Sequence, residues 1–231
     1  QGKAPQQIVL VGGGDPLLSR GDIAALARKT ARALSKSGTT AVSLAVDDFL
    51  FPRPSDAPGW EPGDSPTYAS AVRALGFFGD YSSDTATPVV DAFASGLRSA
   101  GISVVQDGRT VASADAPVIA SNKGGRLSDA IEGMLRVSEN NVAENLFRHV
   151  ALAQGYPATW SGAQAAAREV LSLSMAIHMP RLGLFLDPGL GKTKIGCDLI
   201  QHTYSQDPTR LWLVVALKVN QFTWSKEMKF H

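Results

Sequence analysis

Two spacings of apolar positions divide the chain into expected strands and helices. Short apolar runs are typical of strands, and they occur at residues 7–11, 39–48 and 102–108, with a further strand or strand pair expected at 109–121. Apolar residues at helical spacing predict helices over 21–36, 88–100, 127–138, 141–155 and 160–174. Strands and helices mixed in this order favour the α+β class, or a piece of an α/β enzyme.

A long loop rich in proline and glycine follows the second expected strand. Its sequence is FPRPSDAPGWEPGDSPTY. Loops of this length are usually functional or packed down by side chains, and we expect Trp60 and Tyr68 to be its aromatic anchors. Asp47, Asp48 and Trp60 are interpreted as groups that pack this loop.

The character of the sequence changes after about residue 175. An apolar strand, a glycine loop, a helix and a second strand are expected in turn at 181–187, 188–193, 194–205 and 210–218. This unit has the length of a single strand–helix–strand crossover.

Composition narrows the function classes only slightly. Of the 231 residues, 44% are apolar and 19% are charged, and the net charge of +1 gives no argument for nucleic acid or a membrane surface as partner. Cys197 is the single cysteine, which excludes an internal disulfide framework and a cysteine-rich zinc site. The four histidines are scattered, so no metal site is indicated. We expect no transmembrane helix, and the first residues lack the features of a signal peptide.

Ser138 and Asn140 lie at the joint between two expected helices. By themselves they are most simply interpreted as capping residues, because both side chains satisfy free backbone N–H groups. A hydroxyl and a carboxamide fixed at such a joint can also hold a peptide and relay a proton.

Three stretches in order resemble the serine D-alanyl-D-alanine carboxypeptidases of the low-molecular-mass class C penicillin-binding protein type, peptidase family S13. LVGGGDPLLS resembles that family's LxGxGDPxL, and VDDFLFPRPSDAPGW with SPTYASAVRAL resembles DDxxFxxPxxxPGWxxxD…YxxxxxAL. APVIASNKGGRLSDAIEGMLRVSENNVAENLFRHVA resembles the block that contains the family's SxN motif. The resemblance covers about residues 7–172.

The resemblance implies a function and a fold for this part. Ser138 and Asn140 would be the second active-site motif, the serine helping to move a proton and the asparagine positioning the substrate amide and a lysine. Glu139 replaces the commoner aspartate and is expected to point away from the chemistry. Peptidoglycan stem peptides would be substrates and β-lactams ligands of the intact parent, in an extracytoplasmic location and without a cofactor.

The same resemblance divides the chain. A partial penicillin-binding, serine β-lactamase-like domain would comprise residues 1–19, an inserted accessory region 20–115 and a helical region 116–173. Apolar surface is expected to be exposed on this partial domain.

Two of the three active-site motifs of that family do not occur in the 231 residues. No serine has a lysine three positions later, so there is no SxxK motif, and Lys192-Thr193 is followed by Lys194 where KTG requires glycine. The lysine of SxxK accepts the proton of the nucleophilic hydroxyl. We therefore expect the chain alone to be inactive. A non-catalytic remnant that binds cell wall is a further alternative.

The tail predicts a different chemistry. FLDPGLGKTKIGCDLI supplies Gly189, Gly191, Lys192 and Thr193 in the arrangement of a phosphate-binding loop, with Leu186 where the pattern asks for glycine. With RLWLVVALKVNQFTWSKEMKFH, residues 174–231 resemble the start of a superfamily 2 helicase or DNA-dependent ATPase. That resemblance implies ATP and Mg²⁺ as ligands, DNA as partner and a cytoplasmic location. Hydrolysis is not expected, because the acidic motif that ATPases of this class need is missing.

The two resemblances require different compartments. We therefore interpret the chain as a chimera joined near residues 171–179, with the tail loop as a passenger.

Overall fold

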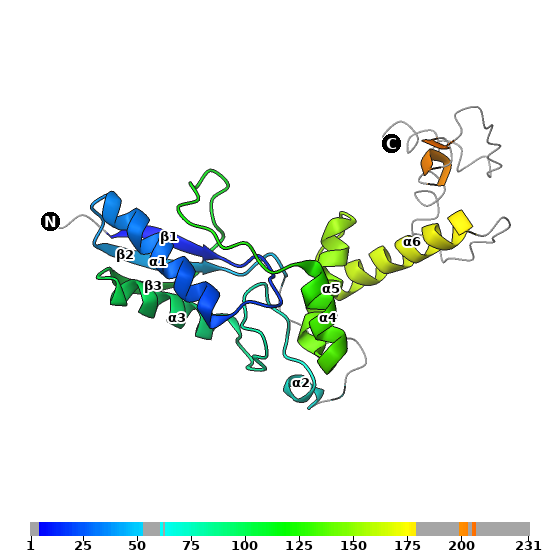
Figure 1. The fold of residues 1–231 in the computed structure, drawn as a ribbon, viewed down its shortest axis with the longest axis horizontal. Coiled ribbons are helices and arrows are strands. Elements are labelled where there is room, and N and C mark those ends of the chain that lie inside the picture. The colour runs from blue at the N-terminus through cyan, green and yellow to red at the C-terminus, as the bar shows by residue number, and fades with distance from the viewer. Residues whose placement is uncertain (1–4, 53–60, 62, 179–198, 203–204, 207–231) are drawn as a thin grey trace. The chain divides into compact units, whose positions relative to one another are not determined.

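Figure 1 shows the computed structural model of the chain, which describes residues 5–52, 61, 63–178, 199–202 and 205–206. The chain divides into two compact units, residues 1–160 and residues 161–231. None of the described helices is long and apolar enough to cross a membrane.

The first unit contains a parallel three-stranded sheet. Its strands are β1 (Gln6–Val11), β2 (Ala41–Asp47) and β3 (Ser103–Arg109), and they lie in the order β1-β2-β3. Parallel neighbours require a crossover connection. Helix α1 (Arg20–Lys36) lies in the first crossover and α3 (Ala86–Ser99) in the second. This mixed architecture is compatible with the α+β class expected from the sequence.

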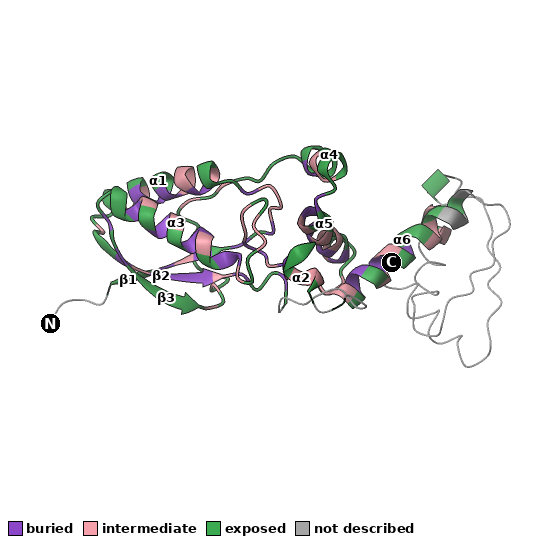
Figure 2. Ribbon diagram, turned by 90° about the horizontal axis from the view of Figure 1, so that it is seen from below, coloured by how far each residue is buried: buried purple, intermediate pink, exposed green. Residues whose placement is uncertain are grey.

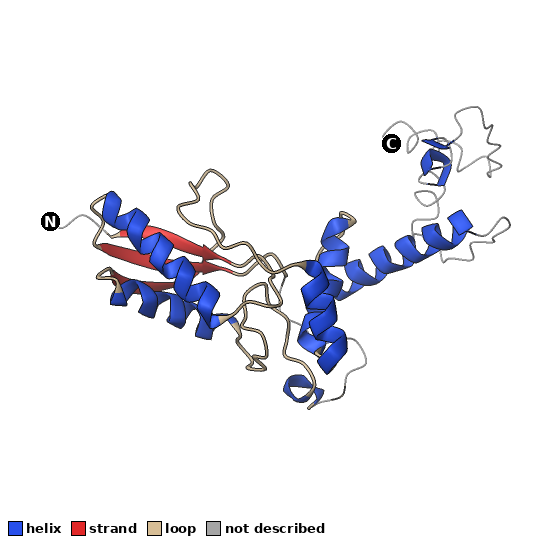
Figure 3. Cartoon of the chain, viewed as in Figure 1, coloured by secondary structure: helices blue, strands red, loops and turns tan. Residues whose placement is uncertain are grey.

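Helices α1 and α3 lie beside each other on one face of the sheet (Figures 2 and 3). Alternate residues of the strands point to that face, as strand geometry requires. The core consists of the apolar side chains that meet there, among them Ile8, Leu10, Ile23, Ala27, Leu34, Val42, Leu44, Val46, Val89, Phe93, Leu97 and Val104. The opposite face is more polar, and the hydroxyl of Ser43 donates there to the carboxylate of Asp107 at 2.9 Å.

The start and the end of helix α1 are both determined by residues next to it in the sequence. Ser19 precedes the helix and forms a capping box with Asp22, in which each side chain bonds the backbone of the other residue. The chain leaves the helix at Ser37 and Gly38, where the glycine has φ +72°. The predicted helix 21–36 is confirmed.

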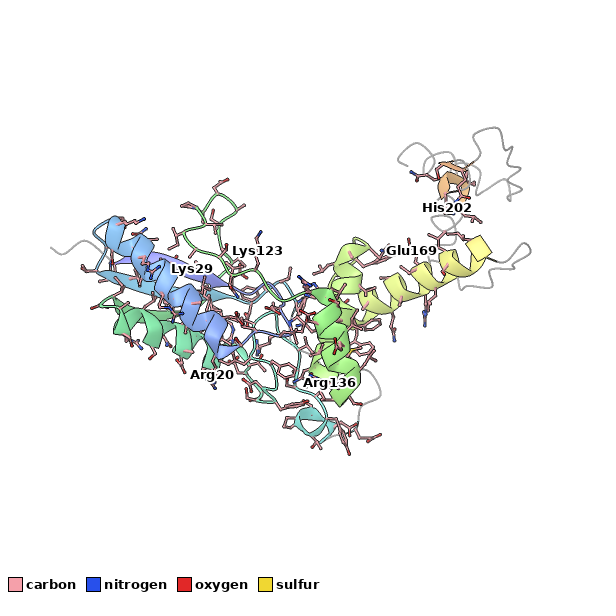
Figure 4. The ribbon with its side chains drawn as sticks, in the orientation of Figure 1. Arg20, Lys29, Lys123, Arg136, Glu169 and His202 are labelled. Carbon is pink, nitrogen blue, oxygen red and sulfur yellow. The ribbon has the colours of Figure 1, made fainter. Side chains whose placement is uncertain are left out.

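The strand expected at 109–121 is wrong apart from Arg109, which ends β3. Residues 110–126 form a loop with exposed apolar side chains, Val118 at 83% exposure. The loop is tied to α1, because Lys29 donates to the backbone carbonyl of Ser121 at 3.2 Å (Figure 4). The alternation of apolar residues in this loop therefore has no strand partner in the part of the chain that the structure describes.

The remaining described elements are helical. They are the short α2 (Asp64–Thr67), α4 (Leu127–Val137), α5 (Asn140–Ala153) and α6 (Trp160–His178). A second apolar cluster, Phe51, Val72, Ala74 and Ala158 with Leu152, packs next to α5. On α4, Leu127 and Leu135 are 64% and 71% exposed, which agrees with the expected exposed apolar surface.

The expectations for the long proline- and glycine-rich loop and for the C-terminal tail are tested only in part. Tyr68 is 59% exposed, so it is not the aromatic anchor that the sequence suggested. Trp60 lies outside the described residues, as do the strands expected at 181–187 and 210–218. Residues 199–202, inside the helix expected at 194–205, are helical.

Candidate active-site motif between helices α4 and α5

Ser138 ends α4 in a backbone conformation that side chains rarely adopt. Its φ and ψ are 54° and 47°, and it is the only residue other than glycine with positive φ in the described part of the chain. The left-handed conformation turns the chain sharply between α4 and α5, and it costs free energy for a residue with a Cβ. Ser138 is exposed at this turn.

Glu139 follows the turn and points into the protein. Its side chain is 7% exposed and caps α5, because the carboxylate oxygen Oε2 accepts a hydrogen bond from the backbone N–H of Val142 at 2.7 Å. The other oxygen, Oε1, accepts from the hydroxyl of Tyr81. The hydrogen bond to Glu139, together with burial and the carboxylate charge, raises the pKa of Tyr81 to about 12.

Asn140 is exposed at the start of α5. Its Nδ2 donates to the backbone carbonyl of Tyr68 at 2.8 Å. Within residues 5–52 and 63–178, no hydrogen bond is made by the hydroxyl of Ser138 or by Oδ1 of Asn140. One hydroxyl and one carbonyl oxygen at this joint are therefore left without a hydrogen-bond partner among the described residues.

From the sequence alone, Asn141 can be interpreted only as a helix-capping residue. Its Oδ1 accepts from the backbone N–H of Ser70 at 2.8 Å, and its Nδ2 donates to the backbone carbonyl of Asp80 at 3.2 Å. Ser70 and Asp80 belong to the loop that joins β2 to α3. No local sequence signal could identify these contacts, because the partners lie 71 and 61 residues earlier in the chain.

Charged groups on α4 and α5 shape the electrostatics near the motif. Arg136 lies exposed in the last turn of α4, where a positive charge is favourable at a helix C-terminus (Figure 4). On α5, burial raises the pKa of Glu144, and the charge of Arg148 opposes that shift. Burial in turn lowers the pKa of Arg148, which is 3% exposed and donates to the carbonyl of Ala158 at 3.0 Å.

Two cavities lined by described residues of the first unit bear on the site. One of about 1010 Å³ is lined by β1, by α1 and by residues of the 110–126 loop, and neither Ser138 nor Asn140 lines it. The second, of about 40 Å³, lies behind the motif and is lined by Glu139, Asn141 and Asn145. Oδ1 of Asn145 is buried there without a partner among the described residues, and the space is sufficient for a water molecule.

A separate cluster of charges gathers where β2 and β3 end. Asp48 is 4% exposed, and its Oδ2 lies 3.2 Å from both Nη1 of Arg73 and Nε of Arg109. Nη2 of Arg109 also lies 2.8 Å from Oδ1 of Asp84. Two carboxylates are thus matched by two guanidinium groups. The burial of Asp48 agrees with the interpretation that it packs this loop.

The structure leaves the other candidates open. Gly189, Gly191, Lys192 and Thr193 lie outside the described residues, so their phosphate-binding role stays a prediction. No group of three or more histidine, cysteine, aspartate or glutamate side chains that could hold a metal ion occurs among the residues that the structure describes.

Comparison with known proteins concerns mainly the first part of the chain. The sequence profile of the D-Ala-D-Ala carboxypeptidase 3 (S13) family matches residues 1–76 and 79–189. A protein named carboxypeptidase Rv3627c, from Mycobacterium tuberculosis, is 30% identical over 70% of this chain. The match covers 39% of that relative, so the chain spans well under half of its length. The family match continues past the junction expected near residues 171–179.

Proposed function

The chain belongs to the D-Ala-D-Ala carboxypeptidase 3 (S13) family, and on this premise we propose that it is part of a serine-type D-alanyl-D-alanine carboxypeptidase or endopeptidase. Its substrates are stem peptides of peptidoglycan, β-lactams are its inhibitors, and it acts outside the cytoplasm. Ser138 and Asn140 form the second active-site motif of this enzyme.

The observation that supports the proposal is the turn at Ser138. The left-handed turn ends α4 and leaves the Ser138 hydroxyl and Oδ1 of Asn140 without hydrogen-bond partners among the described residues. A hydroxyl can accept and pass on a proton, and an amide oxygen can accept from a peptide N–H. Both groups suit a role in holding a peptide and moving a proton beside a nucleophile.

The nucleophile itself must come from elsewhere. Without a serine–lysine pair at SxxK spacing, these 231 residues supply no activated hydroxyl for acylation. We therefore assign to the chain alone the binding of the peptide and no turnover.

Titration with an N-acylated L-lysyl-D-alanyl-D-alanine tripeptide tests this assignment. We expect saturable binding by the chain, at least about tenfold weaker binding by Ser138→Ala and Asn140→Ala, and no covalent label from a fluorescent penicillin. Asn122→Ala is the matched control, because it removes the same amide from the 110–126 loop. Absence of tripeptide binding would contradict the proposal. Binding that is insensitive to both motif substitutions would favour the non-catalytic cell-wall remnant.

A second candidate function, nucleotide binding by the tail, has one observation in its favour, the sequence DPGLGKT at 187–193. Lys192 would reach the phosphates of ATP and Thr193 would hold Mg²⁺. Equilibrium binding of a fluorescent ATP analogue tests it: Lys192→Ala abolishes binding under this hypothesis. The helicase alternative, with DNA as partner, loses its support if the unsubstituted chain does not bind the analogue.

A further inference from the structure

We propose that the loop between β2 and α3 acts as a brace for the Ser138–Asn140 motif, and that Asn141 and Tyr81 are positioning residues of the peptidase site. The brace is defined by Tyr68, Ser70, Asp80 and Tyr81. The inference rests on the proposed function, since the motif that is braced is the one assigned to peptide binding. It gives the region expected to be an accessory scaffold a direct role at that site.

The turn at Ser138 needs support from outside its own helices. A residue with a Cβ in the left-handed region persists only where its surroundings fix it. The contacts of α4 contribute two bonds to one acceptor: the carbonyl of Met134 accepts from the backbone N–H of Ser138 and, at 3.1 Å, from the backbone N–H of Glu139. The side chains that follow Ser138 supply the other constraints.

All three residues after Ser138 are bonded to the brace. Oε1 of Glu139 accepts from the Tyr81 hydroxyl, and Nδ2 of Asn140 donates to the Tyr68 carbonyl. The amide of Asn141 bridges the Ser70 N–H and the Asp80 carbonyl. These partners are separated from the motif by 58 to 72 residues of sequence, so the contacts are tertiary.

Asn141 is the centre of this arrangement. Its amide uses both of its ends on backbone atoms, the oxygen as an acceptor and the nitrogen as a donor. Ser70 is 7% exposed, and its hydroxyl donates to the same Asp80 carbonyl at 3.4 Å. The first turn of α5 is therefore fixed to a buried segment, and Asn140 is fixed next to it.

Tyr81 acts through Glu139. The carboxylate caps α5 with one oxygen and accepts the phenol with the other, so the hydroxyl sets the side-chain position of the residue between Ser138 and Asn140. Removing the hydroxyl leaves the cap in place and frees one carboxylate oxygen. The effect at the motif is expected to be smaller than the effect of removing the amide of Asn141.

The experiment compares Asn141→Leu and Tyr81→Phe with the unsubstituted chain. Ile23→Val is the control, because it removes a methylene from the core between sheet and helices and leaves the motif intact. Two readouts are taken on ¹⁵N-labelled protein at a temperature where all variants are folded. One is the NMR signature of the motif, namely the backbone coupling constant of Ser138 and the side-chain amide signals of Asn140. The other is the dissociation constant of the N-acylated L-lysyl-D-alanyl-D-alanine tripeptide.

We expect Asn141→Leu to shift the motif signals and weaken tripeptide binding about tenfold, and Tyr81→Phe to do so about threefold. Ile23→Val is expected to leave both readouts unchanged. Unchanged motif signals in both brace variants would overturn the inference, as would unchanged affinity in spite of shifted signals. If the unsubstituted chain does not bind the tripeptide, the proposed function fails. The motif signals then decide whether the brace exists.

Discussion

Nε2 of His149 lies 2.7 Å from the carbonyl oxygen of Gly14, which connects α5 to the turn after β1. The imidazole also packs edge-on against Phe51, with 5.4 Å between ring centroids. Gly14 has φ +72°, and a Cβ placed on it would lie 2.7 Å from Nε2 of His149 and 2.8 Å from Cζ of Phe51. Both the left-handed backbone conformation and the lack of room for a Cβ therefore require glycine at this position.

Gly14→Ala is expected to destabilise the fold by about 2–4 kcal/mol. The left-handed conformation contributes about 1–2 kcal/mol of this and the overlap with His149 and Phe51 the rest. Gly38 has the same φ but open space around it, so Gly38→Ala is expected to be destabilised only by the backbone contribution. Gly13→Ala, also in open space, is expected to be nearly neutral. Urea denaturation measures the three free energies of unfolding, and equal losses at 14 and 38 would contradict the steric argument.

The LVGGGDPLLS stretch shows how a sequence pattern follows from packing. Leu10 and Leu18 are buried, whereas Val11 between them in the pattern is 57% exposed. A Cβ on Gly12 would lie 2.7 Å from the carbonyl oxygen of Ala74, and Gly13 has open space. The leucine and glycine positions of LxGxGDPxL are thus the buried or crowded ones.

Asp48→Asn is expected to cost about 3 kcal/mol of stability, the lower end for a broken buried ion pair, because Arg73 and Arg109 remain partly exposed and can be hydrated. Asp84→Asn is the matched control: the Asp84 side chain is 36% exposed and binds the same two arginines, so its loss should cost at most about 1 kcal/mol. Denaturant unfolding of the two variants gives the comparison. A larger loss at Asp84 than at Asp48 would show that burial does not determine the strength of these pairs.

Ser19→Ala is expected to lower stability by about 1 kcal/mol at neutral pH through loss of the helix cap. The Ser19 side chain, followed by its backbone N–H, lowers the pKa of Asp22. A carboxyl with a lowered pKa in the folded state stabilises the fold above its unfolded value of about 3.9 and loses this contribution as pH falls through the folded value. The stability difference between the two proteins should therefore shrink below about pH 4. Thermal unfolding at several pH values checks this, and a difference independent of pH would contradict it.

Local signals in the sequence specify α1, α3, α4 and α5. The expectations that were wrong concern segments whose structure depends on a partner distant in the sequence. RTVASADAPVIAS has the alternation of a strand, yet after Arg109 no strand of the described residues pairs with it, and Val111 is 70% exposed and Ile119 43%. The ring of Tyr68 is exposed, while its carbonyl bonds Asn140. Sequence can mark Ser138 and Asn140 through the family pattern. It cannot show the tertiary bonds of Tyr81 and Asn141. Tyr81 binds a side chain 58 residues away in the sequence, and Asn141 binds backbone groups, which have no residue signature.

The Tyr81–Glu139 bond is open to a spectroscopic test. The pKa of Tyr81 is raised to about 12, first by the hydrogen bond to Glu139 and then by burial and charge. A raised pKa means that the folded state keeps the proton longer, so this contribution to stability is complete below the unfolded value of about 10 and is lost as pH rises through the folded value. Glu139→Gln removes the carboxylate charge and leaves a weaker, neutral acceptor, so we expect the pKa of Tyr81 to fall below its value in the unsubstituted chain.

The pKa of Tyr81 can be measured from the phenolate absorbance as a function of pH. Tyr81 is one of four tyrosines, so it contributes a distinct part of the total absorbance change. Tyr81→Phe identifies this part by removing it. A titration curve that is the same in Glu139→Gln and in the unsubstituted chain would show that the phenol does not bind this carboxylate in solution. In that case the contact between the brace and Glu139 would be absent, and only the amide of Asn141 and the carbonyl of Tyr68 would hold the motif.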